Sequence, residues 1–344
     1  MTGRVILIDR LPGGQQAAAL MVDGRLEDLL IDPPQGDATP VPGEIYRARV
    51  DRLVPKQGAA FVRMGEAMGY LREAKGRREG DRLLVQVTGY AEPDKAVPVT
   101  ARPLYKGRYA IHTPHAPGIN LSRQIKDAEE RARLLAVAEQ ALADQGADPE
   151  TGLILRSAAA QSAPTALSAE VKALLADRDR VEVAEGDGPV YTATARQEAL
   201  REWDAVPSEA AASFETQGVW DEIDRLRSPR AALRSGGWLS VEATAALVAV
   251  DVNTGGGFQS GDALTANLEA AREIPRQLRL RGLGGIVVID WAPLPKRDRK
   301  RIQDTLKTAL RRDPVETTIA GWTPLGLLEL TRKRERRPLA QLLD

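Results

Sequence analysis

The sequence contains no cysteine, only two histidines, and few aromatic residues, which make up 4% of its 344 positions. The lack of cysteine excludes disulfide frameworks and cysteine-ligated zinc, and it fits a reducing compartment. No apolar run approaches the roughly 20 residues that a membrane-spanning helix needs. The N-terminus also lacks the basic and then apolar pattern of a signal peptide. We therefore expect a soluble, cytoplasmic protein that binds neither zinc nor membranes.

Net charge is also lacking, because Lys and Arg balance Asp and Glu over the whole chain. The balance is uneven along the sequence. From Arg272 to Asp344 there are 17 Lys and Arg against nine Asp and Glu, and the preceding residues carry the opposite surplus of eight. Charge runs are usually solvated faces, but a basic block beside an acidic remainder is typical of a protein that binds a polyanion.

The length exceeds that of one ordinary core, which predicts two or more domains. Three strand patterns open the chain, at residues 4–8, 16–22 and 25–31, and Asp23-Gly24 between the last two predicts a tight hairpin. A proline- and glycine-containing break at residues 33–43 then marks a first domain boundary. Residues 168–203 resume the mixed style of the N-terminus, so we expect one domain interrupted by inserted ones.

Five short strand patterns follow the break, at residues 44–50, 59–62, 69–71, 82–87 and 97–100. They predict a small OB-type barrel, a fold that binds single-stranded nucleic acid by stacking bases on aromatic side chains beside a basic groove. Phe61 and Tyr70 are candidates for the stacking residues, and Lys95 is a candidate phosphate or base contact. An aromatic residue in a strand is more often core, and the residues alone favour a core position for Phe61.

The next segment holds both histidines, His112 and His115, in a proline-containing loop. We expect both to be exposed, and no third ligand with suitable spacing supports a metal site. Residues 127–145 predict a helix and residues 152–155 a buried strand. That strand ends in Arg156-Ser157, a pair that can bind a phosphate, although a surface salt bridge explains the same residues equally well.

Further along, Ser168 is a candidate N-cap for a helix over residues 169–177. Residues 180–184 read as a strand, and residues 194–203 as another helix.

Two aspartates follow apolar runs of the same kind. Leu247–Val250 leads into Asp251, and Ile286–Ile289 leads into Asp290, 39 residues later. A glycine turn, Gly255–Gly257, and a long amphipathic helix lie between them. The pattern predicts two parallel strands joined by a helix, with both carboxylates at the same edge of the sheet.

Two such carboxylates suit Mg²⁺, which prefers oxygen ligands and commonly takes one or two from the protein. A metal bound there can promote the hydrolysis of a phosphodiester. For an isolated pair, ordinary strand-end or helix-capping aspartates are at least as common. The barrel and the basic C-terminal block favour the phosphodiester hypothesis. A dinucleotide site is a poor alternative, because the glycine cluster lacks the G-x-G-x-x-G spacing.

The residues around this pair resemble two motifs of the ribonuclease E/G family. Gly236–Leu239 and Ala249–Gly255 match its first metal-site motif. Asn267–Ala271, followed by Arg276–Gly285 and the strand to Asp290, matches the segment that ends at the second. These matches are highly specific, and weaker similarity extends over nearly the whole chain.

The resemblance implies an α/β fold of the α+β multidomain kind. In this family an RNase H-like domain, here residues 1–42 and 168–240, is interrupted by two insertions. They are an S1-type OB barrel, residues 43–104, and a 5′-sensor domain, residues 105–167. A DNase I-like catalytic domain, residues 241–344, is expected to follow.

The resemblance also implies roles for single residues. Asp251 and Asp290 are the expected ligands of Mg²⁺, with Mn²⁺ as an alternative, and Asn253 assists them. Phe61, Tyr70 and Lys95 match the RNA-contacting positions of the barrel, which reverses the preference for a core Phe61. Four further residues match the pocket for a 5′-monophosphate: Gly107, Ile111, Arg156 and Ser157. The family has threonine at the last position, and serine keeps the hydroxyl.

The chain departs from the family pattern in two respects. It has no Cys-x-x-Cys zinc link and ends at Asp344, so no zinc-linked tetramer is expected, although a homodimer through the catalytic domain stays open. Pro275 also falls inside the expected long helix, where it should kink the axis.

Together these patterns predict a Mg²⁺-dependent endoribonuclease for single-stranded RNA, stimulated by a 5′-monophosphate. Its substrates would be rRNA, tRNA or mRNA precursors, among which the sequence does not choose. The alternative hypothesis is an RNA-binding protein of the same fold with weak or no catalysis.

Overall fold

The structure, a computed structural model, describes residues 3–92, 94–148, 150–186, 188–208, 210, 212–256 and 260–343, without the side chains of 260–262. The chain folds into two compact units. Unit 1 comprises residues 1–37 and 206–344, and unit 2 comprises residues 38–205. Unit 1 is therefore built from both ends of the chain. The mixed α/β class is confirmed, while the division into five named domains stays a prediction.

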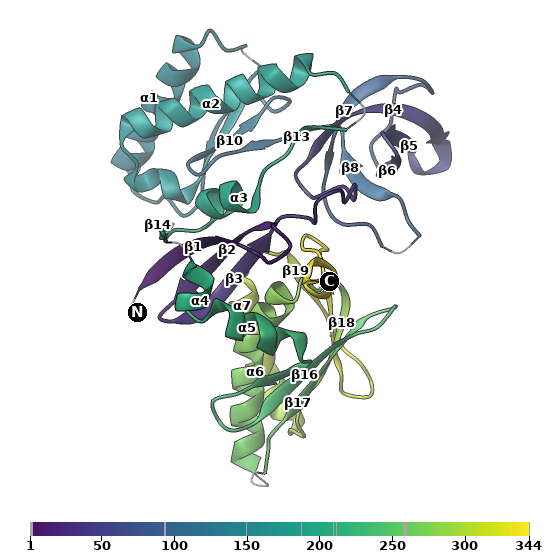
Figure 1. Ribbon diagram of the computed structural model, residues 1–344, viewed down its shortest axis with the longest axis vertical. Coiled ribbons are helices and arrows are strands. Elements are labelled where there is room, and N and C mark those ends of the chain that lie inside the picture. The colour runs from purple at the N-terminus through teal and green to yellow at the C-terminus, as the bar shows by residue number, and fades with distance from the viewer. Residues whose placement is uncertain are drawn as a thin grey trace. The chain divides into compact units, whose positions relative to one another are not determined.

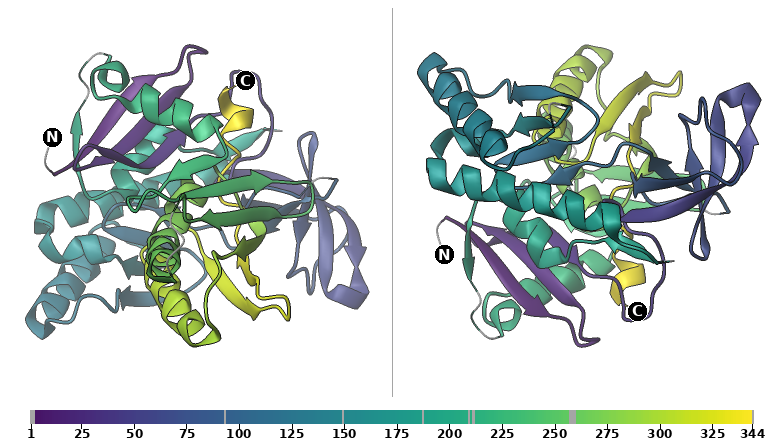
Figure 2. Two further views of the ribbon diagram at one scale, coloured as in Figure 1. Left: turned by 90° about the horizontal axis from the view of Figure 1, so that it is seen from below. Right: turned by 90° about the horizontal axis from the view of Figure 1, so that it is seen from above.

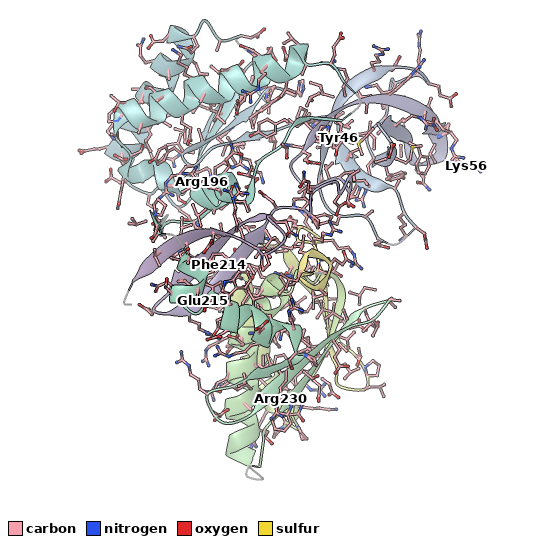
Figure 3. All side chains as sticks on the ribbon, in the orientation of Figure 1. Tyr46, Lys56, Arg196, Phe214, Glu215 and Arg230 are labelled. Atoms are coloured by element: carbon pink, nitrogen blue, oxygen red, sulfur yellow. The ribbon has the colours of Figure 1, made fainter. Side chains whose placement is uncertain are left out.

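The first sheet of unit 1 contains the three predicted N-terminal strands and has the order β14-β1-β2-β3. Its strands are β1 (Arg4–Arg10), β2 (Gln16–Val22), β3 (Arg25–Ile31) and β14 (Val206–Ser208). Asp23 and Gly24 both have positive φ, 50° and 77°, as the predicted tight hairpin requires. Phe214 of α4 (Ser213–Thr216) and Ile223 of α5 (Val219–Arg227) pack in the core of this sheet; Phe214 is labelled in Figure 3.

The second sheet of unit 1 has six strands in the order β15-β16-β17-β18-β20-β19. They are β15 (Arg230–Ala232), β16 (Trp238–Ala243), β17 (Val248–Asn253), β18 (Gly285–Asp290), β19 (Thr317–Trp322) and β20 (Leu328–Arg332). Helix α6 (Ser260–Leu280) connects β17 to β18, and α7 (Arg299–Leu310) lies between β18 and β19, after the short 3₁₀ helix η3 (Lys296–Asp298). Helix α8 (Ala340–Leu343) follows the last strand. The core of this sheet is shared with α6 and α7, which lie against it in Figure 1.

Helix α6 continues through Pro275, so the proline does not end it; the kink expected there stays a prediction. Two buried arginines on α6 bind the first sheet of the same unit. Arg276 donates to the carbonyl oxygen of Leu26 at 2.7 Å, and Arg279 donates to that of Glu27 at 2.7 Å. Asp313, whose side chain is 1% exposed, pairs with Arg279 and with Arg332. These pairs are buried on both sides, so losing one partner would leave a charge uncompensated.

Unit 2 begins with the predicted barrel. Its strands are β4 (Ile45–Val54), β5 (Ala59–Met64), β6 (Ala67–Leu71), β7 (Arg82–Val87) and β8 (Val97–Thr100), with the short 3₁₀ helix η1 (Pro55–Gln57) after β4. They pair in the order β4-β5-β6-β8-β7, and a β4–β7 pair closes the ring. A sixth strand, β13 (Pro189–Tyr191), pairs with β4 on the outside. The five-stranded, OB-like barrel is therefore confirmed.

The rest of unit 2 is a four-stranded sheet in the order β11-β12-β10-β9. Its strands are β9 (Tyr105–Lys106), β10 (Ala110–Thr113), β11 (Gly118–Leu121) and β12 (Gly152–Leu155). The helical elements are α1 (Ala128–Asp144), η2 (Ser157–Gln161), α2 (Pro164–Val183) and α3 (Ala195–Glu202). Figure 2 shows α1 and α2 against the sheet, with the barrel at the other end of the unit. The helices predicted at 127–145 and 194–203 are confirmed.

Two predictions in this stretch are wrong. The helix with Ser168 as N-cap instead starts at Pro164, so Ser168 lies within its second turn. Residues 180–184 do not form a strand, because α2 continues to Val183. The alternation of Val181 and Val183 suggested a strand, but only Val181 is buried, while Val183 is 78% exposed. The expected domain boundary between residues 167 and 168 consequently falls inside α2.

Candidate active site

The two aspartates singled out in the sequence lie next to each other. Strands β17 and β18 are parallel, and Asp251 and Asp290 are direct partners in their register. Adjacent strands are about 4.8 Å apart. Both side chains are exposed, whereas the alternating residues Val250, Val252 and Ile289 point into the core. The predicted pair of parallel strands, with both carboxylates on one edge, is confirmed.

Asn253 belongs to the same group of polar side chains. Its Nδ2 donates to Oδ2 of Asp251 at 2.7 Å, which fixes the orientation of that carboxylate. Neither Asp251 nor Asp290 forms an ion pair with any residue that the structure describes. Two uncompensated carboxylates on neighbouring strands repel each other, and a bound cation relieves that repulsion.

The donor set fits a hard divalent cation. Within the described part of the chain, no group of three or more His, Asp or Glu side chains comes together. A cation held by Asp251 and Asp290 would therefore complete its coordination with water, which is the usual arrangement for Mg²⁺ rather than for structural zinc.

Close backbone contacts shape the turn after β17. A Cβ atom at Gly237 would lie 2.3 Å from the carbonyl oxygen of Asn253, so only glycine fits there. Gly255 has a φ of +74°, and a Cβ atom on it would meet the carbonyl oxygen of Gly236 at 2.7 Å. Gly257, the last glycine of the predicted turn, lies outside the described residues. The glycines bring the Asn253 backbone against the start of β16.

A buried asparagine positions the end of β18. Asn267 of α6 is fully buried, and its side chain forms two hydrogen bonds with the backbone of Ala292, two residues beyond Asp290. The sequence placed Asn267 in a family motif, but nothing in its local pattern revealed this contact.

An aromatic and cationic pair lies on the same face as the aspartates. Trp238 is the register partner of Asn253, and the Arg230 guanidinium lies 4.0 Å from the centre of the Trp238 ring. Arg230 is labelled in Figure 3, at the end of unit 1 that carries β16 and β17. Sequence reasoning assigned no role to Arg230, because its partner is eight residues away and the two strands had to be paired first.

The barrel residues lie in unit 2. Phe61 and Tyr70 are register partners on β5 and β6, and their rings are in edge contact, with centroids 5.4 Å apart. Both are partly exposed, and the guanidinium of Arg52 lies 4.8 Å from the centre of the Phe61 ring. Lys95 is exposed and pairs with Glu92. The rings thus lie outside the barrel core, and their role in binding bases stays a prediction.

The predicted end-binding residues also come together in unit 2. Arg156 donates to the carbonyl oxygen of Gly107 at 2.7 Å, and Ser157 follows it at the start of η2. Ile111 lies on β10, opposite Ile154 of β12. The other end of the Arg156 guanidinium is occupied, because it forms an ion pair of 2.6 Å with Glu202.

A second carboxylate lies beside Gly107. Glu170 of α2 accepts hydrogen bonds from three consecutive backbone N–H groups, those of Arg108, Tyr109 and Ala110, at 2.6–2.8 Å. Three converging N–H groups form an anion-binding nest. This nest was not visible in the sequence, because Glu170 is about 60 residues from the strand that it contacts.

His112 is not exposed as expected. Its side chain is fully buried on β10 and stacks on Tyr105, with centroids 5.7 Å apart. Burial lowers the pKa of His112 to about 4, because a charged imidazolium is poorly solvated there. Strand β10 is only four residues long, too short for its alternation to be recognised.

Known proteins resemble this chain over most of its length. The sequence profile of the "Ribonuclease E/G family" matches residues 105–200 and 190–335. The chain belongs to the ribonuclease E/G family. Ribonuclease G of Salmonella typhimurium is 30% identical over 88% of the chain and 74% of its own length. Ribonuclease E of a Synechocystis species is 30% identical over 95% of the chain, which spans 56% of the relative's length.

Members of this family are endoribonucleases, so the chain is an endoribonuclease, a hydrolase that acts on phosphodiester bonds. Ribonuclease G of Haemophilus influenzae is 27% identical, and this match covers 98% of the chain. The family assignment from the sequence motifs is therefore confirmed. No helix in the described residues is long and apolar enough to cross a membrane.

Proposed function

We propose that this protein hydrolyses phosphodiester bonds of single-stranded RNA with Mg²⁺ held by Asp251 and Asp290. The observation that carries the proposal is the register pairing of two exposed carboxylates with no cationic partner among the described residues. Mn²⁺ offers the same preference for oxygen ligands and is the expected substitute.

The chemistry divides between the cation and the chain. Bound Mg²⁺ supplies positive charge against the negative charge that develops on the phosphate during hydrolysis. Asp251 and Asp290 hold it, and the amide of Asn253 keeps the Asp251 carboxylate in one orientation. Net, a bond forms between a water oxygen and phosphorus, the bond to the leaving ribose oxygen breaks, and a proton passes to that oxygen.

The proposal includes the contacts of the RNA outside the reaction centre. Phe61 and Tyr70 present partly exposed rings for base stacking, and the exposed Lys95 supplies positive charge from the same barrel. Arg156 and Ser157 bind a 5′-monophosphate, which stimulates cleavage. The substrates of the protein are precursors of rRNA, tRNA or mRNA, and the reaction takes place in the cytoplasm.

The test is cleavage of a short fluorescent single-stranded RNA at increasing Mg²⁺ concentrations. Asp251→Asn and Asp290→Asn should each lower the rate by about 100-fold or more, since each removes a direct ligand. Asp304→Asn, an exposed aspartate on α7, is the matched control and should cleave normally. Binding of Mn²⁺, followed by electron paramagnetic resonance, should weaken in the first two variants alone.

Cleavage by both variants at the wild-type rate would exclude the site. Salt-sensitive RNA binding without any Mg²⁺-dependent cleavage by the wild type would identify an RNA-binding protein instead.

A further inference from the structure

Unit 2 contains a cleft of about 720 Å³ that no predicted site residue lines. Its walls come from the β6–β7 loop and β7 of the barrel, from the segment after β8, and from the C-terminal part of α2. We call it the basic cleft. Its volume lies within the range of about 300–1,000 Å³ typical of ligand sites.

The charges of the basic cleft are predominantly positive. Five of its lining residues are cationic: Lys75, Arg77, Arg82, Arg102 and Arg178. Among the described lining residues only Glu73 and Glu182 are acidic, and these pair with Arg102 at 3.4 Å and with Arg178 at 4.0 Å. Arg178 also pairs with Asp179 at 2.6 Å. The side chains of Lys75, Arg77 and Arg82 form no ion pair with any described residue. Three exposed cations are therefore available to an anionic ligand.

The lining of the basic cleft also includes apolar side chains. Leu83, Pro103 and Tyr105 are buried, and the more accessible ones are partly exposed: Leu84, Ala101 and Pro114. A ligand that carries both negative charge and flat apolar surface matches this combination, since the cations can bind phosphates and the partly exposed apolar side chains can contact bases.

Hydrogen bonds between the barrel and α2 give the basic cleft a fixed shape. Arg47 of β4 donates to the carbonyl oxygens of Ala184 at 2.9 Å and Glu182 at 2.8 Å, at the C-terminal end of α2. On the other side, Gln86 of β7 bonds both the N–H and the carbonyl of Leu104 at 2.9 Å. The cleft is thus formed before any ligand binds, which lowers the entropic cost of binding.

We propose that the basic cleft binds nucleotides of the single-stranded RNA substrate, with phosphates on Lys75, Arg77 and Arg82. This inference rests on the proposed function and adds a contact separate from the barrel aromatics and from the end-binding residues. Free nucleotides also carry phosphates and bases, and the experiment distinguishes binding of RNA from binding of free nucleotides.

The experiment measures equilibrium binding of a short fluorescent single-stranded RNA to the full chain in EDTA. Without Mg²⁺ the proposed hydrolysis does not occur, so failure of the catalytic proposal leaves this measurement intact. The informative pair is Arg82→Glu in the cleft and Lys172→Glu on α2. Both residues are exposed, both changes shift the net charge by the same amount, and Lys172 does not line the cleft.

Arg82→Glu should weaken RNA binding by about tenfold and lower the slope of log affinity against log salt by about one to two. Lys172→Glu should leave both quantities near the wild-type values. Lys75→Glu, in the β6–β7 loop outside any strand, should repeat the effect of Arg82→Glu. This second variant controls for a folding defect in Arg82→Glu, and thermal unfolding followed by circular dichroism detects such a defect.

Equal losses in the cleft and control variants would overturn the proposal, because they would reflect general charge alone. Unchanged RNA binding in both cleft variants would also overturn it. In a second arm, ATP competes with the RNA. If ATP binds in the cleft while RNA binding is insensitive to Arg82→Glu, the site serves free nucleotides and the RNA proposal is wrong.

Discussion

Asn267 and Ala292 form a closed pair of hydrogen bonds between α6 and the segment after β18. Nδ2 of Asn267 donates to the Ala292 carbonyl oxygen at 2.9 Å, and the Ala292 N–H donates to Oδ1 at 3.0 Å. Both groups are buried, so each satisfies the other where water has no access. The helix that connects β17 to β18 therefore also fixes the chain just beyond Asp290.

The first prediction concerns this pair. Asn267→Leu removes both bonds and leaves the backbone groups of Ala292 unsatisfied, which should lower the free energy of unfolding by about 1–3 kcal/mol. Cleavage should fall as well, with weaker Mn²⁺ binding. Asn267→Asp keeps the shape and the acceptor but loses the donor to the Ala292 carbonyl oxygen, so it should also destabilise the fold. Unaltered Mn²⁺ binding in Asn267→Leu would show that the pair stabilises the fold without positioning Asp290.

A second prediction follows from the backbone contact at Gly237. Gly237→Ala places a Cβ atom 2.3 Å from the carbonyl oxygen of Asn253 and should force the end of β17 away from β16. We expect a loss of about 1–3 kcal/mol in unfolding free energy and about tenfold slower cleavage. Gly256→Ala is the control, because a Cβ atom there meets nothing within 4 Å. Similar cleavage rates in Gly237→Ala and Gly256→Ala would show that this contact does not position the site.

A third prediction concerns the end-binding residues. Glu202 forms an ion pair with Arg156 and would compete there with the proposed 5′-phosphate, so Glu202→Gln should raise the preference for 5′-monophosphate over 5′-hydroxyl RNA. The gain should be at most about fivefold, because partly exposed ion pairs contribute about 0.2–1 kcal/mol. Arg156→Ala should abolish the preference. Asp204→Asn removes a neighbouring carboxylate, which pairs with Arg108, and controls for net charge. An identical increase in Asp204→Asn would point to charge alone.

The fourth prediction concerns pH. Burial holds the pKa of His112 at about 4, below the ordinary value of 6.5, so the unfolded state binds a proton more readily than the folded state does. The stability that neutral His112 contributes is fully present above pH 6.5 and is lost as the pH falls toward 4. The loss is about 1.4 kcal/mol for each pH unit in this window.

The measurement is the free energy of unfolding in urea between pH 4 and pH 7, for the wild type and for His112→Phe. The difference between the two should grow as the pH rises. The chain has only two histidines, so the imidazole NMR signal of His112 can be assigned with His115→Gln. A His112 signal that titrates near 6.5 would contradict the prediction.

The sequence predicted every strand of the barrel and of the N-terminal hairpin. The bounds of β2, β3, β7 and β8 are as expected, whereas β4 extends four residues further. Those elements are short runs rich in apolar residues and are bounded by turn residues such as Asp23-Gly24, so their pattern is local. Helix α2 was mistaken because Val181 and Val183 alternate at its end. Its C-terminal carbonyls are bound by Arg47, which is more than 130 residues away.

The candidate site was predictable only in part, because some of its contacts join residues that are far apart in the sequence. Asp251 and Asp290 were found because each directly follows a run of apolar residues in the sequence. Arg230, on the same face as the aspartates, was not found, because it reaches Trp238 through strand pairing. Glu170 beside Gly107 in unit 2 was missed because tertiary packing brings it to its partners. For His112 the sequence predicted an exposed position in a loop, because the strand that buries it is only four residues long.

The alternation along β18 also limits how this protein can change in length over evolution. Ile289 and Asp290 point to opposite sides of the sheet, so one residue inserted within β18 would turn the aspartate inward and the isoleucine toward solvent. Such an insertion would remove both the site and part of the core at once. We expect related sequences to vary in length in the segment between β16 and β17, and to keep the spacing inside β17 and β18 unchanged.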